Sequence, residues 1–287
     1  MIKNWISASR PRTLPTSVAP VILATTYAWQ AEKVNWKVFV ICMLFALAAQ
    51  IASNFANDYF DFKHGSDKPN RVGPRRAVAS GDIKPQTMLR ATIITLAIAA
   101  VLGCMLIPIG SWPLVVLGAI IILFALAYSA GPYPLSYHGL GEVTVFIFFG
   151  IVPVTATYWL QTSEVSVSVV IGAAVMGLLS SNILLVNNYR DYETDKIDGK
   201  RTSVVILGRK FAIVTYLVNG ILATLMLCAS YIGVVFALLF LFLHIKTWMG
   251  LKKSEGTALN AYIGLTARNQ LLFTIIYVIL VAIEVII

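Results

Sequence analysis

Two stretches of the chain carry an asparagine that is followed four residues later by an aspartate. The first pair is Asn57 and Asp61, and the second is Asn187 and Asp191. On a helix this spacing places both side chains on one face, one turn apart. Carboxylate and amide oxygens, with no cysteine or histidine among them, suit a hard cation such as Mg²⁺, which also takes phosphate oxygens as ligands. The candidate metal ligands are Asn57, Asp61, Asp67, Asp191 and Asp195, with Asp58 beside them.

Basic residues follow each acidic stretch. Next to an acid cluster that binds magnesium, Arg and Lys side chains can hold the oxygens of a diphosphate that the metal does not take. The combination therefore predicts a diphosphate site. The candidate bases are Lys63, Lys68, Arg71, Arg75, Arg76 and Lys84 after the first stretch, and Lys196, Lys200 and Arg201 after the second.

Further polar side chains lie on the turns that carry the acids. Gln50 and Asn54 precede Asn57 at helical spacing, and Asn188 adjoins the second pair. Such a stripe is costly in lipid unless it faces a wet cavity or the interior of a bundle. We therefore expect the acids and amides to face a cavity.

The composition identifies the elements that must position these residues. Hydrophobic residues make up 58% of the 287 residues and charged residues only 12%, against about 25% charged in soluble domains. This composition predicts an integral membrane protein with one membrane-embedded domain over residues 1–287. The net charge of +9 lies in loops between apolar runs, where cytoplasmic retention accounts for it without a nucleic-acid partner.

Apolar runs near the length of a membrane span recur along the whole chain. They predict an all-α polytopic bundle of nine transmembrane helices with a central cavity open to the cytoplasmic side. The predicted spans are residues 14–30, 36–60, 87–107, 112–130, 141–160, 166–192, 211–230, 232–250 and 269–287.

The distribution of positive charge predicts the orientation of these spans. With the N-terminus inside the cell, all 22 Lys and Arg residues except Lys33 and Lys37 fall on the cytoplasmic side. The odd number of spans then places the C-terminus outside. The loops at 61–86 and 193–210 both face the cytoplasm, so the two acidic stretches can meet at the cytoplasmic surface of the cell membrane.

A diphosphate bound at the mouth of a cavity between membrane helices suggests a lipid diphosphate whose tail runs into the bilayer. Metal and bases would stabilise the departing diphosphate while an allylic carbon gains positive charge and an acceptor attacks it. Aromatic rings can stabilise that cation. The candidates are Tyr59, Phe60, Tyr128, Tyr133, Phe146, Phe148 and Phe149.

The motif Asn57-Asp58-x-x-Asp61, with Asp191-x-x-x-Asp195 later in the chain, resembles the paired aspartate-rich motifs of the UbiA superfamily. These are intramembrane prenyltransferases of nine helices that use Mg²⁺ and a polyprenyl diphosphate. Within the superfamily, three further runs are similar to the 1,4-dihydroxy-2-naphthoate polyprenyltransferases of menaquinone synthesis. They are Gly73-Pro74-Arg75-Arg76, Gly139-Leu140-Gly141-Glu142 and Gly199-Lys200-Arg201-Thr202.

The resemblance implies roles for particular residues. Asn57, Asp61, Asp191 and Asp195 would hold Mg²⁺ and diphosphate, and Glu142 would contact acceptor or metal. The implied phosphate or acceptor-carboxylate contacts are Lys68, Arg71, Arg75, Arg76, Lys200 and Arg201. Many members carry another Asp four residues after the position of Asp61, where this chain has Gly65. Asp67 is the candidate replacement, and the acid that completes the first metal site is left open.

Three other interpretations fit parts of the pattern. The acids could be solvated charges at helix ends. A transferase of the same superfamily could use another acceptor, such as 4-hydroxybenzoate, homogentisate or haem. A cation-coupled transporter would also place acids within the membrane, but it predicts them near the bilayer midplane rather than beside bases at the cytoplasmic ends of spans.

Overall fold

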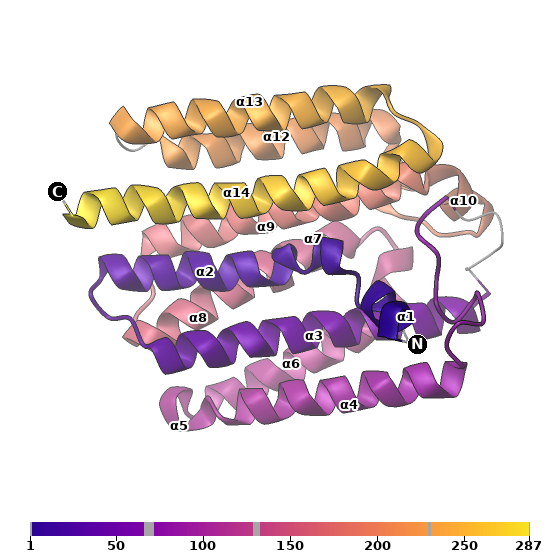
Figure 1. Cartoon of the computed structure of the whole chain (residues 1–287), viewed down its shortest axis with the longest axis horizontal. Coiled ribbons are helices and arrows are strands. Elements are labelled where there is room, and N and C mark those ends of the chain that lie inside the picture. The colour runs from indigo at the N-terminus through magenta and orange to yellow at the C-terminus, as the bar shows by residue number, and fades with distance from the viewer. Residues whose placement is uncertain (1, 66–71, 129–132, 229–230, 287) are drawn as a thin grey trace.

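The protein is a bundle of long helices that pack side by side (Figure 1). The computed structural model describes residues 2–65, 72–128, 133–228 and 231–286, and within these ranges all regular secondary structure is helical. The long helices are α2 (Pro15–Gln30), α3 (Trp36–Lys63), α4 (Pro85–Cys104), α6 (Pro113–Ala127), α8 (Val152–Thr162), α9 (Val167–Arg190), α12 (Arg209–Leu227), α13 (Tyr231–Lys253) and α14 (Leu259–Ile286). The short ones are α1 (Ile2–Ala8), η1 (Pro11–Thr13), α5 (Ile107–Gly110), η2 (Leu135–Tyr137), α7 (Gly141–Phe146), η3 (Ile147–Ile151), α10 (Tyr192–Ile197), α11 (Ser203–Leu207) and η4 (Gly256–Ala258).

Each of the nine predicted spans falls on a helical segment of the described chain. Seven of these segments are long and apolar enough to cross a membrane, which makes the chain a multi-pass membrane protein. The other two, α2 and α6, have 16 and 15 residues. The fifth predicted span is divided, because α7 and α8 are joined by the π-helical turn η3.

The predicted start of the last span, residue 269, was wrong by ten residues, since α14 begins at Leu259. Polar residues in its first turns lower the hydropathy of that region. Asn269 and Gln270 are nevertheless buried, and they donate hydrogen bonds to Thr247 and Ser180 on neighbouring helices. A hydropathy profile penalises such residues although the bundle satisfies them.

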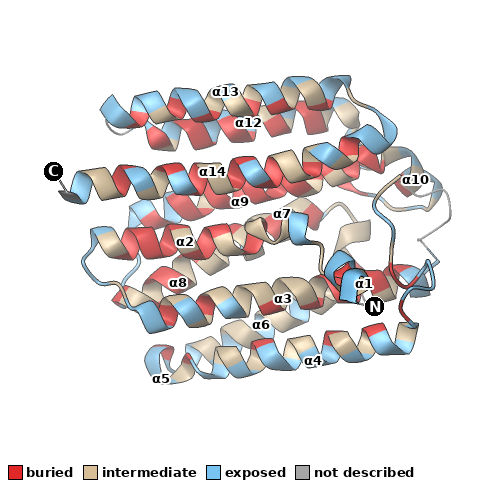
Figure 2. Ribbon diagram, viewed as in Figure 1, coloured by how far each residue is buried: buried red, intermediate tan, exposed pale blue. Residues whose placement is uncertain are grey.

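Helix α9 lies at the centre of the bundle, and 72% of its apolar window is buried, more than in any other candidate span. Figure 2 shows α9 and α2 largely buried, while α4 and α13 present exposed faces. Those faces carry large apolar side chains, among them Ile93, Val101 and Leu239. The outer surface is therefore suited to contact with lipid.

One end of the bundle gathers the segments that carry the polar motifs. Figure 1 shows α1 and the N-terminus at the same end as α10, with the C-terminus at the opposite end. The carboxyl ends of α3 and α9 also lie at this end. The predicted convergence of the two acidic stretches is thus present in the fold.

Two glycines bring the π-helical turn η3 into direct contact with α9. A Cβ atom added at Gly150 would lie 2.3 Å from the Cα of Gly177, and one added at Gly177 would lie 2.6 Å from the backbone oxygen of Phe146. Only glycine permits this approach of two backbones. The contact fixes the α7–α8 segment against the central helix.

We expect Gly150→Ala to lower the melting temperature of the protein in detergent. The added methyl group overlaps the backbone of α9, and overpacking of this kind costs about 1–3 kcal/mol. Gly118→Ala is the matched control, because no described atom beyond the neighbouring backbone of its own helix lies within 4 Å of a Cβ at that position. Equal melting temperatures for the two variants would contradict the close glycine contact.

Candidate active site

A polar cavity of about 380 Å³ lies at the end of the bundle where the acidic stretches meet. Its walls come chiefly from the N-terminal segment, α3, α9, α10 and the loops that follow α3 and α10, with further residues from α7, η3 and α14. Most of the site residues predicted from the sequence line it, namely Gln50, Asn54, Asn57, Asp61, Arg76, Tyr128, Asn188, Asp191, Asp195 and Lys200.

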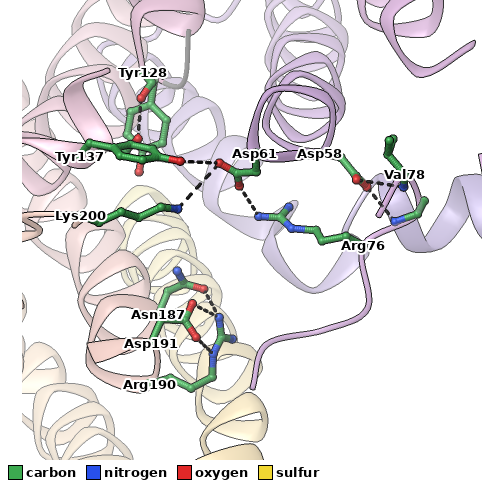
Figure 3. A network of polar contacts seen from close by, with 12 residues as sticks. Asp58, Asp61, Arg76, Val78, Tyr128, Tyr137, Asn187, Arg190, Asp191 and Lys200 are labelled. Carbon is green, nitrogen blue, oxygen red and sulfur yellow. Dashed lines mark hydrogen bonds and ion pairs between the residues drawn. The ribbon is translucent and has the colours of Figure 1, made fainter. Parts of the chain in front are cut away.

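Asp61 is the centre of the first charge cluster. Nη2 of Arg76 donates to its Oδ2 at 2.8 Å, Nζ of Lys200 lies 3.9 Å from its Oδ1, and the Tyr137 hydroxyl lies 3.5 Å from the same oxygen. Figure 3 shows Tyr137 and Lys200 on one side of Asp61 and Arg76 on the other. The side chains of Asp61 and Arg76 are only 11% and 10% exposed. One buried carboxylate therefore joins three segments that are distant in sequence.

Lys200 is held over the ring of Tyr137, with Nζ 4.4 Å from the ring centroid. The backbone N–H of Arg201 donates to the Tyr137 carbonyl at 2.9 Å, which fixes the loop after α10 to the loop before α7. Burial lowers the pKa of Lys200, but Asp61, Tyr137 and Asp195 raise it by more, so that the pKa lies above its ordinary value. Lys200 consequently keeps its positive charge at physiological pH.

Asp191 is the centre of the second charge cluster, at the end of α9. Arg190 donates to it through Nε at 2.7 Å and through Nη2 at 2.5 Å, and Nη2 also donates to Oδ1 of Asn187 at 2.8 Å. Nη1 of Arg190 donates to Asn260, whose own Nδ2 donates to the Val72 carbonyl. This chain of hydrogen bonds connects α9, α14 and the loop after α3.

The oxygen donors of the cavity fit a hard divalent cation in chemical type. Within the described residues, however, no three Asp, Glu, His or Cys side chains converge on a single metal position. Asn57 and Asp61 belong to one wall of the cavity, and Asp191 and Asp195 to another. The acids form two facing sets, with bases between and beside them.

Asp58, predicted beside the metal ligands, points away from the cavity. Its carboxylate accepts hydrogen bonds from the backbone N–H groups of Ala77 at 3.1 Å and Val78 at 3.2 Å. Figure 3 shows this contact on the side of α3 remote from Lys200. The spacing of the sequence could not reveal it, since Asp58 precedes Asp61 by three residues and so lies on a similar face of the helix. In the structure Asp58 holds the loop after α3.

Arg75 and Arg201, two predicted phosphate contacts, also lie outside the cavity lining. Arg75 is exposed and pairs with Asp82 at 2.9 Å, and Arg201 is exposed in the loop after α10. The predicted residues Asp67, Lys68 and Arg71 lie outside the described residues.

Glu142 stands behind the cavity wall at the start of α7. Its Oε1 accepts hydrogen bonds from Nδ2 of Asn188 at 2.8 Å and Oγ of Ser203 at 2.6 Å. Its Oε2 is buried and receives no hydrogen bond from the described residues. Glu142 thus connects α7 to α9 and α11 and orients the Asn188 side chain that lines the cavity.

The polar cavity continues into an apolar one of about 180 Å³ between α2, α3, α6 and α8. The two share lining residues, which are Gln50, Ser53, Tyr128, Thr144 and Phe149. Of the aromatic residues predicted to line a cavity, Tyr128 and Phe149 lie at this junction and Phe148 lies in the apolar part. Tyr133 instead stacks on His138, and Phe146 packs against Gly177.

Sequence reasoning missed Arg10, Tyr137 and Asp198. Arg10 and Asp198 line the polar cavity, and Tyr137 contacts both Asp61 and Lys200. For Arg10 a signal was present, because it directly precedes the proline that opens η1, at the end of the chain predicted to be cytoplasmic. For Tyr137 the sequence has no motif or spacing that relates it to the acids.

These features define a class of protein: a multi-pass helical membrane protein in which a charged cavity at one end of the bundle opens into an apolar one. The UbiA prenyltransferase family model matches residues 17–282. The chain therefore belongs to the UbiA prenyltransferase family.

Curated relatives are similar in sequence over most of the chain. It is 40% identical over 206 residues to a 1,4-dihydroxy-2-naphthoate octaprenyltransferase of Mycobacterium tuberculosis, covering 71% of this chain and 70% of the relative. It is 37% identical over 210 residues to the protein of that name from Escherichia coli, covering 71% and 68%.

Solved structures share the fold. A UbiA homolog from Archaeoglobus fulgidus bound to DMAPP and Mg²⁺ matches with a TM-score of 0.66 at 13% identity, covering 96% of this chain and 99% of that one. The apo structure of a UbiA homolog from Aeropyrum pernix matches with a TM-score of 0.68 at 15% identity, covering 94% and 98%.

We expect Asp58→Ala to destabilise the protein. It leaves two buried backbone N–H groups of the loop at Ala77 and Val78 without an acceptor, at about 1–3 kcal/mol for each unsatisfied donor. Thermal melting and limited proteolysis of the 72–84 loop measure the effect. Asp82→Ala, which removes an exposed carboxylate from the same loop, should change stability by about 0.5 kcal/mol or less. Equal stability of both variants would refute the loop-holding role of Asp58.

Proposed function

We propose that this protein transfers a polyprenyl group from a polyprenyl diphosphate to 1,4-dihydroxy-2-naphthoate. Diphosphate and CO₂ are released, and demethylmenaquinol forms in the synthesis of menaquinone. The observation that carries this proposal is the polar cavity, which holds two facing sets of acids and bases and continues into the apolar cavity. A lipid diphosphate has the same division into a charged head and an apolar tail. The name of the curated relatives supports the acceptor.

Mg²⁺ is the cofactor we infer from the donor set. Asn57 and Asp61 would hold it on one wall and Asp191 and Asp195 on the other, with the diphosphate between the two sets. When bound, Mg²⁺ would stabilise the negative charge of the departing diphosphate. The two facing sets suit a diphosphate bound between them, since its two phosphates present oxygens in both directions.

Arg76 and Lys200 supply the positive charge for the remaining phosphate oxygens. Both now contact Asp61. A bound diphosphate would be a second anion within the same cavity. Arg76 and Lys200 could then pair with phosphate while Asp61 binds Mg²⁺. Guanidinium and ammonium groups both form strong charge-assisted hydrogen bonds with phosphate. The surrounding residues thus stabilise a leaving group as its negative charge grows.

The junction of the two cavities positions the allylic carbon. With the diphosphate among the acids and the tail in the apolar cavity, the first carbon of the tail lies near Tyr128 and Phe149. The faces of these rings can stabilise the positive charge that develops as the carbon–oxygen bond breaks. A ring carbon of the acceptor then forms the new carbon–carbon bond. Departure of CO₂ returns its bonding electrons to the ring.

The topology that we infer is nine membrane crossings in one domain spanning residues 1–287. The cavity opens to the cytoplasm, the N-terminus is inside and the C-terminus outside. The charge distribution supports this orientation, because the end of the bundle that carries the cavity also carries nearly all of the Lys and Arg residues. The bilayer is the protein's immediate partner.

We expect Asp61→Ala and Asp191→Ala each to reduce prenyl transfer by at least about a hundredfold, since each removes an oxygen donor from its set. Glu193→Ala is the matched control, because Glu193 is exposed beside the second motif and does not line the cavity. Chelation by EDTA should abolish transfer and added Mg²⁺ should restore it. Full activity of either aspartate variant, with unchanged gel-filtration behaviour, would refute the proposed metal sites.

The acceptor is tested by the loss of CO₂. We expect purified protein with farnesyl diphosphate, 1,4-dihydroxy-2-naphthoate carrying ¹⁴C in its carboxyl group, and Mg²⁺ to release labelled CO₂ and prenylated product in equal amounts. Prenylation of 4-hydroxybenzoate or homogentisate in place of the naphthoate would assign the chain to another acceptor within the same family.

A further inference from the structure

The N-terminal segment is built into the cavity wall rather than lying free on the membrane surface. Trp5 packs edge-on against Phe55 of α3, with ring centroids 5.4 Å apart. Ala8 is buried among Phe55 and the apolar residues of the 72–84 loop. Nδ2 of Asn54 donates to the Ser9 carbonyl at 2.9 Å. These contacts hold the chain at the point where it enters the site.

Arg10 directly follows that anchored carbonyl and adopts a left-handed backbone conformation, with φ 52° and ψ 65°. This conformation is unfavourable for an arginine and is readily adopted by glycine. Local hydrogen bonds maintain it: the Arg10 N–H donates to Ser7, and the N–H and Oγ1 of Thr13 both donate to the Arg10 carbonyl. A strained arginine where glycine would fit indicates a use for its side chain.

Arg10 lines the polar cavity from the N-terminal segment, whereas the other bases come from the loops after α3 and α10. Its backbone is held at Asn54, which precedes Asp61 by seven residues, or about 10 Å along α3. Asn54 adjoins Ser53 and lies one turn from Gln50, and both of these residues line the junction with the apolar cavity. Arg76 and Lys200 are instead gathered at Asp61. The backbone of Arg10 is therefore anchored beside the part of α3 that lines the junction, where the reacting carbon would lie.

We propose that Arg10 binds the carboxylate of the aromatic acceptor and thereby sets its ring against the junction at Tyr128 and Phe149. The proposal rests on the function proposed above, in which the acceptor is an aromatic acid. A guanidinium matches a carboxylate through two parallel hydrogen bonds, which fix orientation as well as position. The surrounding Gln50, Ser53 and Thr16 add uncharged polar groups suited to a hydroxylated ring.

The test uses Arg10→Gly in the full-length protein. Glycine removes the side chain and favours the left-handed backbone, so the variant should melt at or above the wild-type temperature. We expect the KM for 1,4-dihydroxy-2-naphthoate to rise about 30-fold or more, while the KM for farnesyl diphosphate stays within about twofold. Arg10→Lys should recover only part of the loss, because an ammonium cannot bind both oxygens in the same way.

Arg12→Ala is the matched control. Arg12 lies two residues further along in the same turn, is exposed and does not line the cavity. Both KM values should stay within about twofold of wild type, since surface substitutions away from special contacts have small effects. A second control is 1,4-dihydroxynaphthalene, which lacks the carboxylate. As a competitive inhibitor it should bind wild type and Arg10→Gly equally.

Three results would overturn the proposal. An increase in the KM for farnesyl diphosphate alone would make Arg10 a phosphate ligand. Unchanged KM values for both substrates would leave it without a part in binding. A loss of affinity for 1,4-dihydroxynaphthalene as large as for the naphthoate would show that the carboxylate is not what Arg10 recognises. Failure of the proposed function is distinguishable, because then wild type itself would not prenylate the naphthoate.

Discussion

The pairing of Asp61 with Arg76 and Lys200 is the interaction on which the site depends. A charge buried at the end of an apolar bundle is costly unless a partner and hydrogen bonds compensate it. Arg76 comes from the loop after α3 and Lys200 from the loop after α10, so satisfying one carboxylate folds both loops over the same cavity. The same charges suit a bound diphosphate with its cation. In the proposed complex the acid would bind the metal and the bases would bind phosphate, so the charges would be compensated both with and without substrate.

The position of the second acid set depends on buried polar contacts around α9. Nδ2 of Asn182 donates to the Tyr216 carbonyl at 3.1 Å, and Nδ2 of Asn219 donates to Asn182 at 2.8 Å. Nε2 of Gln270 donates to Ser180 at 2.8 Å. Inside a bilayer, an apolar helix face can pack against lipid as well as against another helix, so apolar burial does not fix the rotation of the helix. Buried hydrogen bonds and close glycine contacts fix it instead. They determine which way the end of α9 presents Asp191.

Much of this arrangement could be predicted from the sequence, because two strong physical rules act on it. Each span that hydropathy predicted coincides with a helical segment of the described residues, and the charge rule brought the two acidic stretches to one surface. The direction of individual side chains could not be predicted, since it depends on loop paths that neither rule describes. Asp58 therefore appeared equivalent to Asp61, although the loop at Ala77 and Val78 engages it. Arg10 was overlooked because only the docking of α1 on α3 turns it inward.

The change from charged to apolar lining within one cavity accounts for how a lipid diphosphate would be oriented. A charged group that entered the apolar part would lose its ion-pair and hydrogen-bond partners. An apolar tail is stabilised when it leaves the polar part for the apolar one. Orientation thus needs no specific contact with the tail. The apolar part holds about 180 Å³, little more than an engineered cavity of about 150 Å³ that accepts benzene. A polyprenyl tail exceeds this volume, so most of it must lie outside, among the lipids. Recognition on this architecture is concentrated at the head group and the first few carbons, where the charges are.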